Sequence, residues 1–148
     1  MSLSYRDENG DEQAIAGTPY DKLDELDTRL DGVETYSTEE HVVGTWIDGK
    51  PLYRKVYHGT STTIPSGQTY ARQIVDANLN TGTINTIDIR GGMYYTGRSG
   101  WIPFNWYSAS ANFCEAREFA DGLVLNFAGS HFQNQQYHII IEYTKIAD

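Results

Sequence analysis

Cysteine, basic charge and long apolar runs are all scarce in this sequence. Cys114 is the only cysteine among 148 residues, so no disulfide can form within the chain. The 11 Lys and Arg face 20 Asp and Glu, for a net charge of −9. A chain with this balance lacks the basic surface that binds a phosphate backbone and is repelled by anionic membranes. We therefore expect no nucleic-acid partner. No apolar run approaches the roughly 18 residues that span a bilayer, so we also expect no membrane insertion.

The start of the chain also lacks the features of a secretory leader. The first residues, MSLSYRDENGDEQ, contain no apolar core of a signal peptide. A lone cysteine fits synthesis in a reducing cytoplasm. Cys114 has Phe113 and Ala116 nearby, and no base is placed beside it by the sequence, so we predict a packed apolar side chain rather than a nucleophile.

Recognisable catalytic motifs are missing as well. The sequence has no Gly-rich phosphate loop, no nucleophile elbow and no paired-histidine metal motif. His41 and His58 stand at the outer ends of one predicted hairpin, where we expect a solvated pair rather than a metal site. Four acids could in principle supply a glycosidase carboxylate pair, which is defined by its separation in space: Asp88, Glu115, Glu118 and Asp121. We predict no enzyme activity, no cofactor and no bound metal.

The acidic excess is confined to the first 40 residues. Residues 1–40 contain 12 acids and three bases, whereas residues 41–148 contain eight of each. A change of composition of this kind marks a domain boundary. We predict three segments: an acidic flexible tail over 1–17, a short oligomerising helix over 18–35, and a β-sandwich head domain over 36–148.

The predicted helix carries one apolar stripe. Thr18 can cap it and Pro19 suits its first position. The stripe has spacings of three, four and three residues and consists of Leu23, Leu26, Leu30 and Val33. So narrow a stripe is typical of a coiled-coil seam, although it covers only about two heptads. We predict self-association through it; the alternative is a helix that packs on its own β domain, and the helix alone does not determine the number of chains.

The sequence is rich in residues that form strands and turns. It contains 11 Tyr, three Trp and five Phe beside 14 Gly, and aromatics favour strands as glycine favours turns. Asp48-Gly49 lies between two alternating runs and predicts a hairpin over 41–60, and Asp121-Gly122 predicts a second. We predict an all-β fold of roughly eight antiparallel strands, arranged as a sandwich or jelly roll.

Further strands are predicted from alternating apolar and polar residues. Gly91-Gly92 is expected to form a bend or bulge between two of them. The remaining predicted strands occupy residues 69–79, 83–90, 93–95, 101–109, 112–119, 123–127 and 137–145, with a turn of helix as the alternative for 69–79.

Four residues in the centre of this domain are candidates for a sugar-binding surface: Trp101, Asn105, Tyr107 and Arg98. On a single strand over 101–109, the first three share one face, and Arg98 lies in the preceding turn. An aromatic ring stacks on the C–H face of a sugar while amide and guanidinium groups bond its hydroxyls. The alternative is that Trp101 and Tyr107 pack in the core or at a subunit interface.

Residues 36–57, YSTEEHVVGTWIDGKPLYRKVY, resemble the opening of the distal head domain of tail-fibre or baseplate receptor-binding proteins from phages and prophages of Gram-positive hosts. The segments GWIPF at 100–104 and IEYTK at 141–145 occupy similar relative places, so the resemblance covers about residues 36–146. GTWIDGKPLYRK is the most specific part of it.

This resemblance implies a trimer in which a short helical stalk leads to a β-sandwich head. It implies a virion protein made in the host cytoplasm, in contact with other virion proteins and with host cell-surface carbohydrate. No binding residue is carried over from the family. We predict a non-enzymatic adhesin; the alternatives are a capsid-decorating protein, a purely architectural trimerisation domain, or a glycosidase that acts on polysaccharide.

Overall fold

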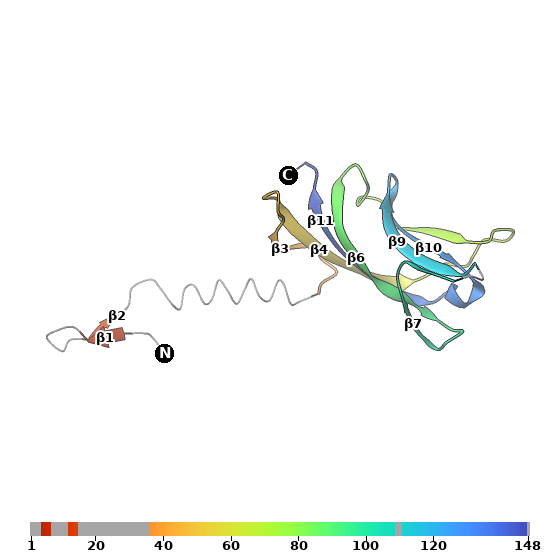
Figure 1. Ribbon diagram of the computed structural model, residues 1–148, viewed down its shortest axis with the longest axis horizontal. Coiled ribbons are helices and arrows are strands. Elements are labelled where there is room, and N and C mark those ends of the chain that lie inside the picture. The colour runs from red at the N-terminus through yellow and green to blue at the C-terminus, as the bar shows by residue number, and fades with distance from the viewer. Residues whose placement is uncertain (1–3, 7–11, 15–35, 109–110, 148) are drawn as a thin grey trace. The chain divides into compact units, whose positions relative to one another are not determined.

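The computed structural model (Figure 1) describes four stretches of the chain: residues 4–6, 12–14, 36–108 and 111–147. The chain divides into two compact units, Met1–Thr35 and Tyr36–Asp148. The predicted helix over 18–35, with its seam of Leu23, Leu26, Leu30 and Val33, lies outside the described residues and stays a prediction.

The described residues of the first unit form one short strand pair. β1 (Ser4–Arg6) and β2 (Glu12–Ala14) are antiparallel. The sequence analysis assigned no strand to this acidic tail. The sequence does contain an Asn-Gly dipeptide between the two strands, at positions 9 and 10, and this dipeptide is a common signal of a hairpin.

The larger sheet of the second unit has five strands in the order β3-β4-β11-β6-β7, all antiparallel. Its strands are β3 (His41–Thr45), β4 (Pro51–Thr60), β6 (Ile84–Tyr95), β7 (Gly100–Pro103) and β11 (Gln136–Lys145). The hairpin predicted about Asp48-Gly49 is confirmed. Gly49 has φ 88°, and the Trp46 amide donates to the Lys50 carbonyl at 2.8 Å.

The smaller sheet has four strands in the order β5-β10-β9-β8, also antiparallel. Its strands are β5 (Ala71–Asp76), β8 (Trp106–Tyr107), β9 (Phe113–Phe119) and β10 (Gly122–Ala128), and a 3₁₀ turn, η1 (Ser130–Phe132), leads from β10 toward β11. The predicted hairpin at Asp121-Gly122 is confirmed, with Gly122 at φ 142°.

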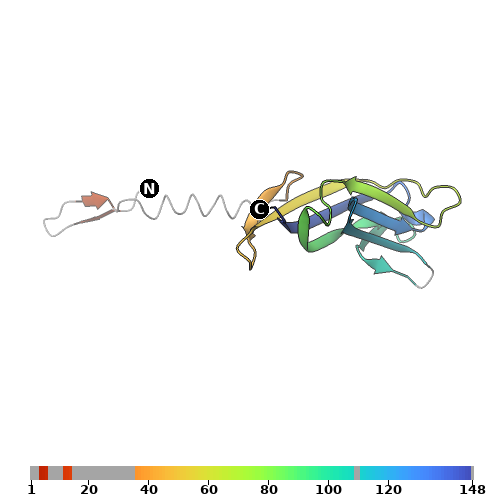
Figure 2. The ribbon, with the colours of Figure 1, turned by 90° about the horizontal axis from the view of Figure 1, so that it is seen from above.

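The two sheets form separate layers in Figures 1 and 2, with the core between them. The smaller sheet contributes Leu123, Leu125 and Phe127, and β11 contributes Ile139 and Ile141, all with no exposed surface. Burial of each such side chain contributes about 1.5–3 kcal/mol. The second unit is therefore an all-β, sandwich-like domain, as the sequence analysis predicted.

The prediction of a single strand over 101–109 is wrong. The chain forms β7 in the larger sheet and then β8 in the smaller one. Asn105 lies between them with φ 59°, a left-handed conformation that ends a strand and redirects the chain. The sequence contained Pro103 as a sign of irregularity but no sign of a change of sheet.

The predicted break at Gly91-Gly92 is also wrong. β6 runs through both glycines without interruption, and each pairs with β11. A Cβ at Gly91 would lie 2.1 Å from the His138 carbonyl oxygen, and one at Gly92 would lie 2.4 Å from that of Ile102. These glycines allow neighbouring strands to approach closely rather than bend the chain.

Candidate functional site

One face of the five-stranded sheet is turned away from the core, and we call it the outer face. Along β11, Tyr137, Ile139 and Ile141 are buried toward the second sheet, while the residues between them are only half-buried. Successive strand residues point to opposite faces. His138 and Glu142 therefore belong to the outer face, together with the residues opposite them on β4 and β6.

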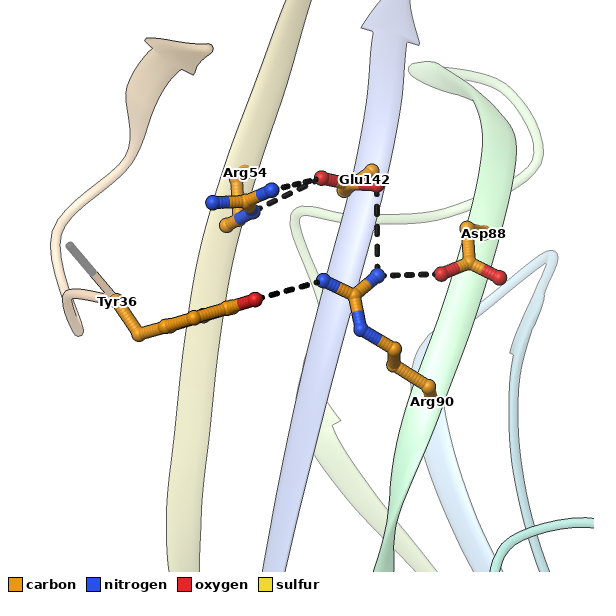
Figure 3. Close-up of polar contacts among 5 residues, drawn as sticks. All are labelled: Tyr36, Arg54, Asp88, Arg90 and Glu142. Carbon is orange, nitrogen blue, oxygen red and sulfur yellow. Dashed lines mark hydrogen bonds and ion pairs between the residues drawn. The ribbon is translucent and has the colours of Figure 1, made fainter. Parts of the chain in front are cut away.

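An ion-paired network occupies part of the outer face (Figure 3). Nε and Nη2 of Arg54 lie 2.8 and 2.6 Å from Oε2 of Glu142. Nη1 of Arg90 donates to Asp88 at 2.5 Å and lies 3.4 Å from Oε1 of Glu142, and its Nη2 donates to the Tyr36 hydroxyl at 3.4 Å. Burial alone would lower the pKa of Arg90, but the bonds to Tyr36 and Asp88 and the charge of Glu142 raise it. Two cations and two anions thus neutralise one another.

Further along the outer face lies a hollow of about 310 Å³. We call it the histidine–tryptophan hollow, and its lining residues are His58, Gly59, Thr60, Trp101, Gln136, Tyr137 and His138. No Asp or Glu is among them, although the chain holds 20 acids. The residues come from β4, β7 and β11; β4 pairs with β11, and β6 lies between β11 and β7 in the sheet.

The register of the sheet brings the key side chains together. His58 on β4 is directly opposite His138 on β11, and Gly92 on β6 is opposite both His138 and Pro103 of β7. Because Gly92 has no side chain, the Trp101 ring reaches across β6 and lies 4.8 Å, centroid to centroid, from the His138 ring. Trp101 remains 48% exposed, so one part of the indole is held and the rest faces solvent.

The two imidazoles of this hollow have no hydrogen bond or ion pair with any residue that the structure describes; the ring contact of His138 with Trp101 is the interaction found. The predicted proximity of His41 and His58 is wrong. His41 is opposite Arg54, because β3 pairs with the first residues of β4 only. His58 instead has His138 as its partner in register.

A second hollow lies between β6 and β9, with a volume of about 420 Å³. We call it the acidic groove, and it is lined by Thr86, Ile87, Asp88, Ile89, Asn105, Tyr107, Glu115, Ala116, Arg117 and Glu118. Three of the four acids that the sequence analysis considered as a glycosidase pair therefore line one groove. The fourth, Asp121, forms an exposed ion pair with Arg72 at 2.5 Å.

Protein contacts already use much of the polar lining of the acidic groove. Glu115 accepts hydrogen bonds from the Tyr107 hydroxyl and, at 3.0 Å, from Nδ2 of Asn126. The bond to Glu115 raises the pKa of Tyr107, which keeps the phenol neutral. The buried Thr86 hydroxyl has no partner among the described residues. The Tyr107 ring, by contrast, is 61% exposed and open to solvent.

The structure divides the sugar-binding surface that the sequence predicted. Trp101 lines the histidine–tryptophan hollow, whereas Asn105 and Tyr107 line the acidic groove. Arg98 lies in the turn between β6 and β7, where its backbone N–H donates to the Tyr95 carbonyl at 3.3 Å. The division follows from Asn105, because the chain changes sheets there.

The sequence analysis missed the histidines and Gln136 as neighbours of Trp101. His58 and His138 are 80 positions apart, and only the β4–β11 register makes them adjacent. Gln136 is the first residue of β11, at the end of an amide-rich loop that the sequence did show. The alternation of residues along each strand could be predicted from the sequence, but which strands pair, and in what register, could not.

Cys114 is a packed apolar side chain, as predicted. It is fully buried, and burial raises the pKa of its thiol to about 12. A thiol held neutral in this way is a poor nucleophile. Within the described residues, no cluster of three His, Cys, Asp or Glu is arranged to hold a metal ion.

The chain matches no known protein family, no characterised protein and no solved structure. None of the helices in the part of the chain that the structure describes is long and apolar enough to cross a membrane. The function of the chain is therefore inferred from the chemistry of the two hollows.

Proposed function

We propose that the second unit is a carbohydrate-binding adhesion head, and that the chain is a non-enzymatic structural protein of a phage or prophage virion. The observation that carries this proposal is the half-exposed Trp101 at the histidine–tryptophan hollow. The likeness of residues 36–57 to the opening of fibre-type head domains supports it. The target is a glycan of the host cell surface.

The chemistry of this hollow suits a sugar ring. An indole face that is fixed on one side and open on the other stacks on C–H groups. Gln136 and Thr60 offer amide and hydroxyl groups to sugar hydroxyls, and the imidazoles of His58 and His138 offer further donors and acceptors. A volume of about 310 Å³ accommodates one or two sugar rings against an open surface.

Trimerisation belongs to the same proposal. Leu23, Leu26, Leu30 and Val33 would form a short coiled-coil stalk before the head, and three heads would present three hollows. Such multivalency raises avidity without any new contact. Other virion proteins would hold the assembly at a tail or on a capsid, and a jelly-roll arrangement of the head is part of this expectation.

Replacement of Trp101 tests the proposal. Trp101→Ala in the full chain should reduce binding to a responsive glycan at least about tenfold, because a stacked aromatic ring contributes on the order of 1–3 kcal/mol. Binding is measured on a glycan array and then by calorimetry. Tyr107→Ala is the matched control, since Tyr107 is 61% exposed on the other sheet and should leave glycan binding intact. Loss with Tyr107→Ala but not with Trp101→Ala would move the site to the acidic groove and refute the proposal.

A glycosidase is the second candidate, because Asp88, Glu115 and Glu118 line one groove. Two of these carboxylates are engaged: Asp88 with Arg90, and Glu115 with Tyr107 and Asn126. General acid–base cleavage needs carboxyl groups free to exchange protons with the substrate. Released reducing ends in the same binding samples would favour the enzyme, and intact glycan would favour the adhesin.

A further inference from the structure

We infer that the ligand of the histidine–tryptophan hollow is an acidic saccharide, held more tightly as the imidazoles of His58 and His138 take up protons. The inference rests on the proposed function and adds the chemical class of the glycan. Its basis is the juxtaposition of two unpartnered imidazoles beside a half-exposed indole, in a hollow that contains no carboxylate.

The charge of the hollow supports an anionic ligand. The second unit has eight bases and eight acids from residue 41 onward, and the ion pairs found among its described residues engage five of those bases and four of those acids. The histidine–tryptophan hollow is different, because its ionisable groups are two histidines and Tyr137. Burial raises the pKa of Tyr137, so this phenol stays neutral. Protonation can therefore make the hollow cationic, and nothing in its lining can make it anionic near neutral pH.

The groups around the two histidines do not cancel such a charge. On β6, Gly92 faces His138, and the next outer residues along that strand are Arg90 and Tyr94. On β7 the neighbour is Trp101, which contacts Tyr94 edge-on at 6.0 Å. On β11 the nearest acid of the outer face is Glu142, whose carboxylate is already bonded to Arg54 and Arg90. The last residues of β4 have no second strand partner within the described chain.

Geometry favours a two-point contact. Side chains directly opposite each other in an antiparallel pair have Cβ atoms about 4.5–5.5 Å apart. Two imidazoles at this spacing can each donate an N–H to one carboxylate or phosphate group, in charge-assisted bonds that are stronger than neutral ones. The Trp101 ring, held against His138, would stack on the sugar that carries the acid. An indole face also stabilises an adjacent imidazolium.

The test compares two polymers with the same sugar backbone, one with free carboxylates and one with the carboxylates esterified. Polygalacturonate carries one carboxylate per sugar and stays ionised above about pH 5, while its methyl ester has the same backbone without the charge. The full chain is titrated with each polymer by calorimetry at pH 5.5 and 7.5. Because imidazoles ordinarily titrate between pH 5 and 8, we expect binding to polygalacturonate to be at least about fivefold tighter at pH 5.5.

Histidine variants assign the effect to the hollow. The double variant His58→Gln/His138→Gln should lose the pH dependence and the preference for the acidic polymer. His41→Gln is the matched control, a histidine of the same sheet outside the hollow, and it should keep both. Equal near-ultraviolet circular dichroism and melting temperature show that the variants are folded. EDTA should change nothing; loss of binding on chelation would make the imidazoles metal ligands and overturn the inference.

The remaining outcomes separate this inference from the function on which it rests. Equal binding of both polymers, abolished by Trp101→Ala and independent of pH, would leave the adhesin proposal standing and overturn the acidic-ligand inference. No binding of either polymer at either pH overturns the inference, and the adhesin proposal is then decided separately by the array experiment with Trp101→Ala. If the pH effect persists in the double variant, groups elsewhere in the chain cause it, and the inference is also overturned.

Discussion

At the scale of single residues, Glu40 ties the lead-in of the second unit to the end of β11. Its carboxylate accepts a hydrogen bond from the Tyr143 hydroxyl and forms an ion pair with Nζ of Lys145 at 2.5 Å. Tyr143 is fully buried. Burial alone would raise the pKa of Glu40. The bonds from Lys145 and Tyr143 lower the pKa by a larger amount, so the net change is downward. The folded state therefore favours the ionised carboxylate.

Glu40→Gln should lower the free energy of unfolding by about 0.5–1 kcal/mol at pH 7, because the charge-assisted bonds are lost but solvent screens this partly exposed pair. A pKa lowered in the folded state gives stability that is present above the ordinary glutamate pKa of about 4.3 and lost as pH falls through the lower folded value. The gap between wild type and variant should thus close from pH 5 toward pH 3. Urea titrations across that range measure it, with Glu39→Gln as the control, because the neighbouring Glu39 forms no ion pair with the described residues. A gap that is constant with pH would contradict the argument.

At the scale of elements, the pairing of β6 with β11 decides where the site lies. Gly91 is opposite Ile139, in a backbone conformation with φ 127°, and it lies against the His138 carbonyl. Both properties exclude a side chain at this position. The same pairing places Gly92 opposite His138, on the outer face of the sheet.

Gly91→Ala should destabilise the second unit by about 2–4 kcal/mol, through backbone strain and a clash with the neighbouring strand. For a chain of this size the melting temperature should fall by roughly 5–15 °C. Gly44→Ala on β3 is the matched control, because no atom lies within 4 Å of a Cβ there, and it should change stability by less than about 0.5 kcal/mol. Equal melting temperatures for the two variants would show that the register tolerates a side chain at position 91.

Elements were predictable from sequence where a local pattern is sufficient. The Asp48-Gly49 hairpin, the strand over 137–145 and the buried Cys114 follow from turn chemistry, alternation and apolar neighbours. The transfer of the chain from β7 to β8 was not predictable, because the left-handed conformation of Asn105 depends on the packing of both sheets around it. The sugar surface predicted from one strand was divided for this reason.

At the scale of the whole molecule, the proposed trimer depends on residues 18–35. The apolar stripe there is narrow, and acids occupy much of the remaining helix surface, so such a helix is marginal alone and needs a partner. Three copies in a short coiled coil would bury the stripe and place the heads together. Residues 41–148 carry no net charge, so net-charge repulsion between the heads does not oppose such an assembly.

Leu26→Asp should dissociate the full-length oligomer, because a charge would be buried at the centre of the seam. Light scattering should then give the mass of one chain, against three for the wild type. Thr28→Asp places the same charge outside the stripe and should leave the mass unchanged. A trimer that survives Leu26→Asp would place the interface in the β head and refute the seam hypothesis, and a wild-type monomer would refute the trimer itself.

The sequence by itself determined the β class of the second unit and its hairpins, because turn residues and alternation act over a few neighbouring positions. Only the tertiary structure decided the site. It placed His58 beside His138, brought Trp101 across Gly92, and separated Trp101 from Tyr107. The physical reason is that strand register and choice of sheet depend on packing of the whole core, which no local pattern of residues contains.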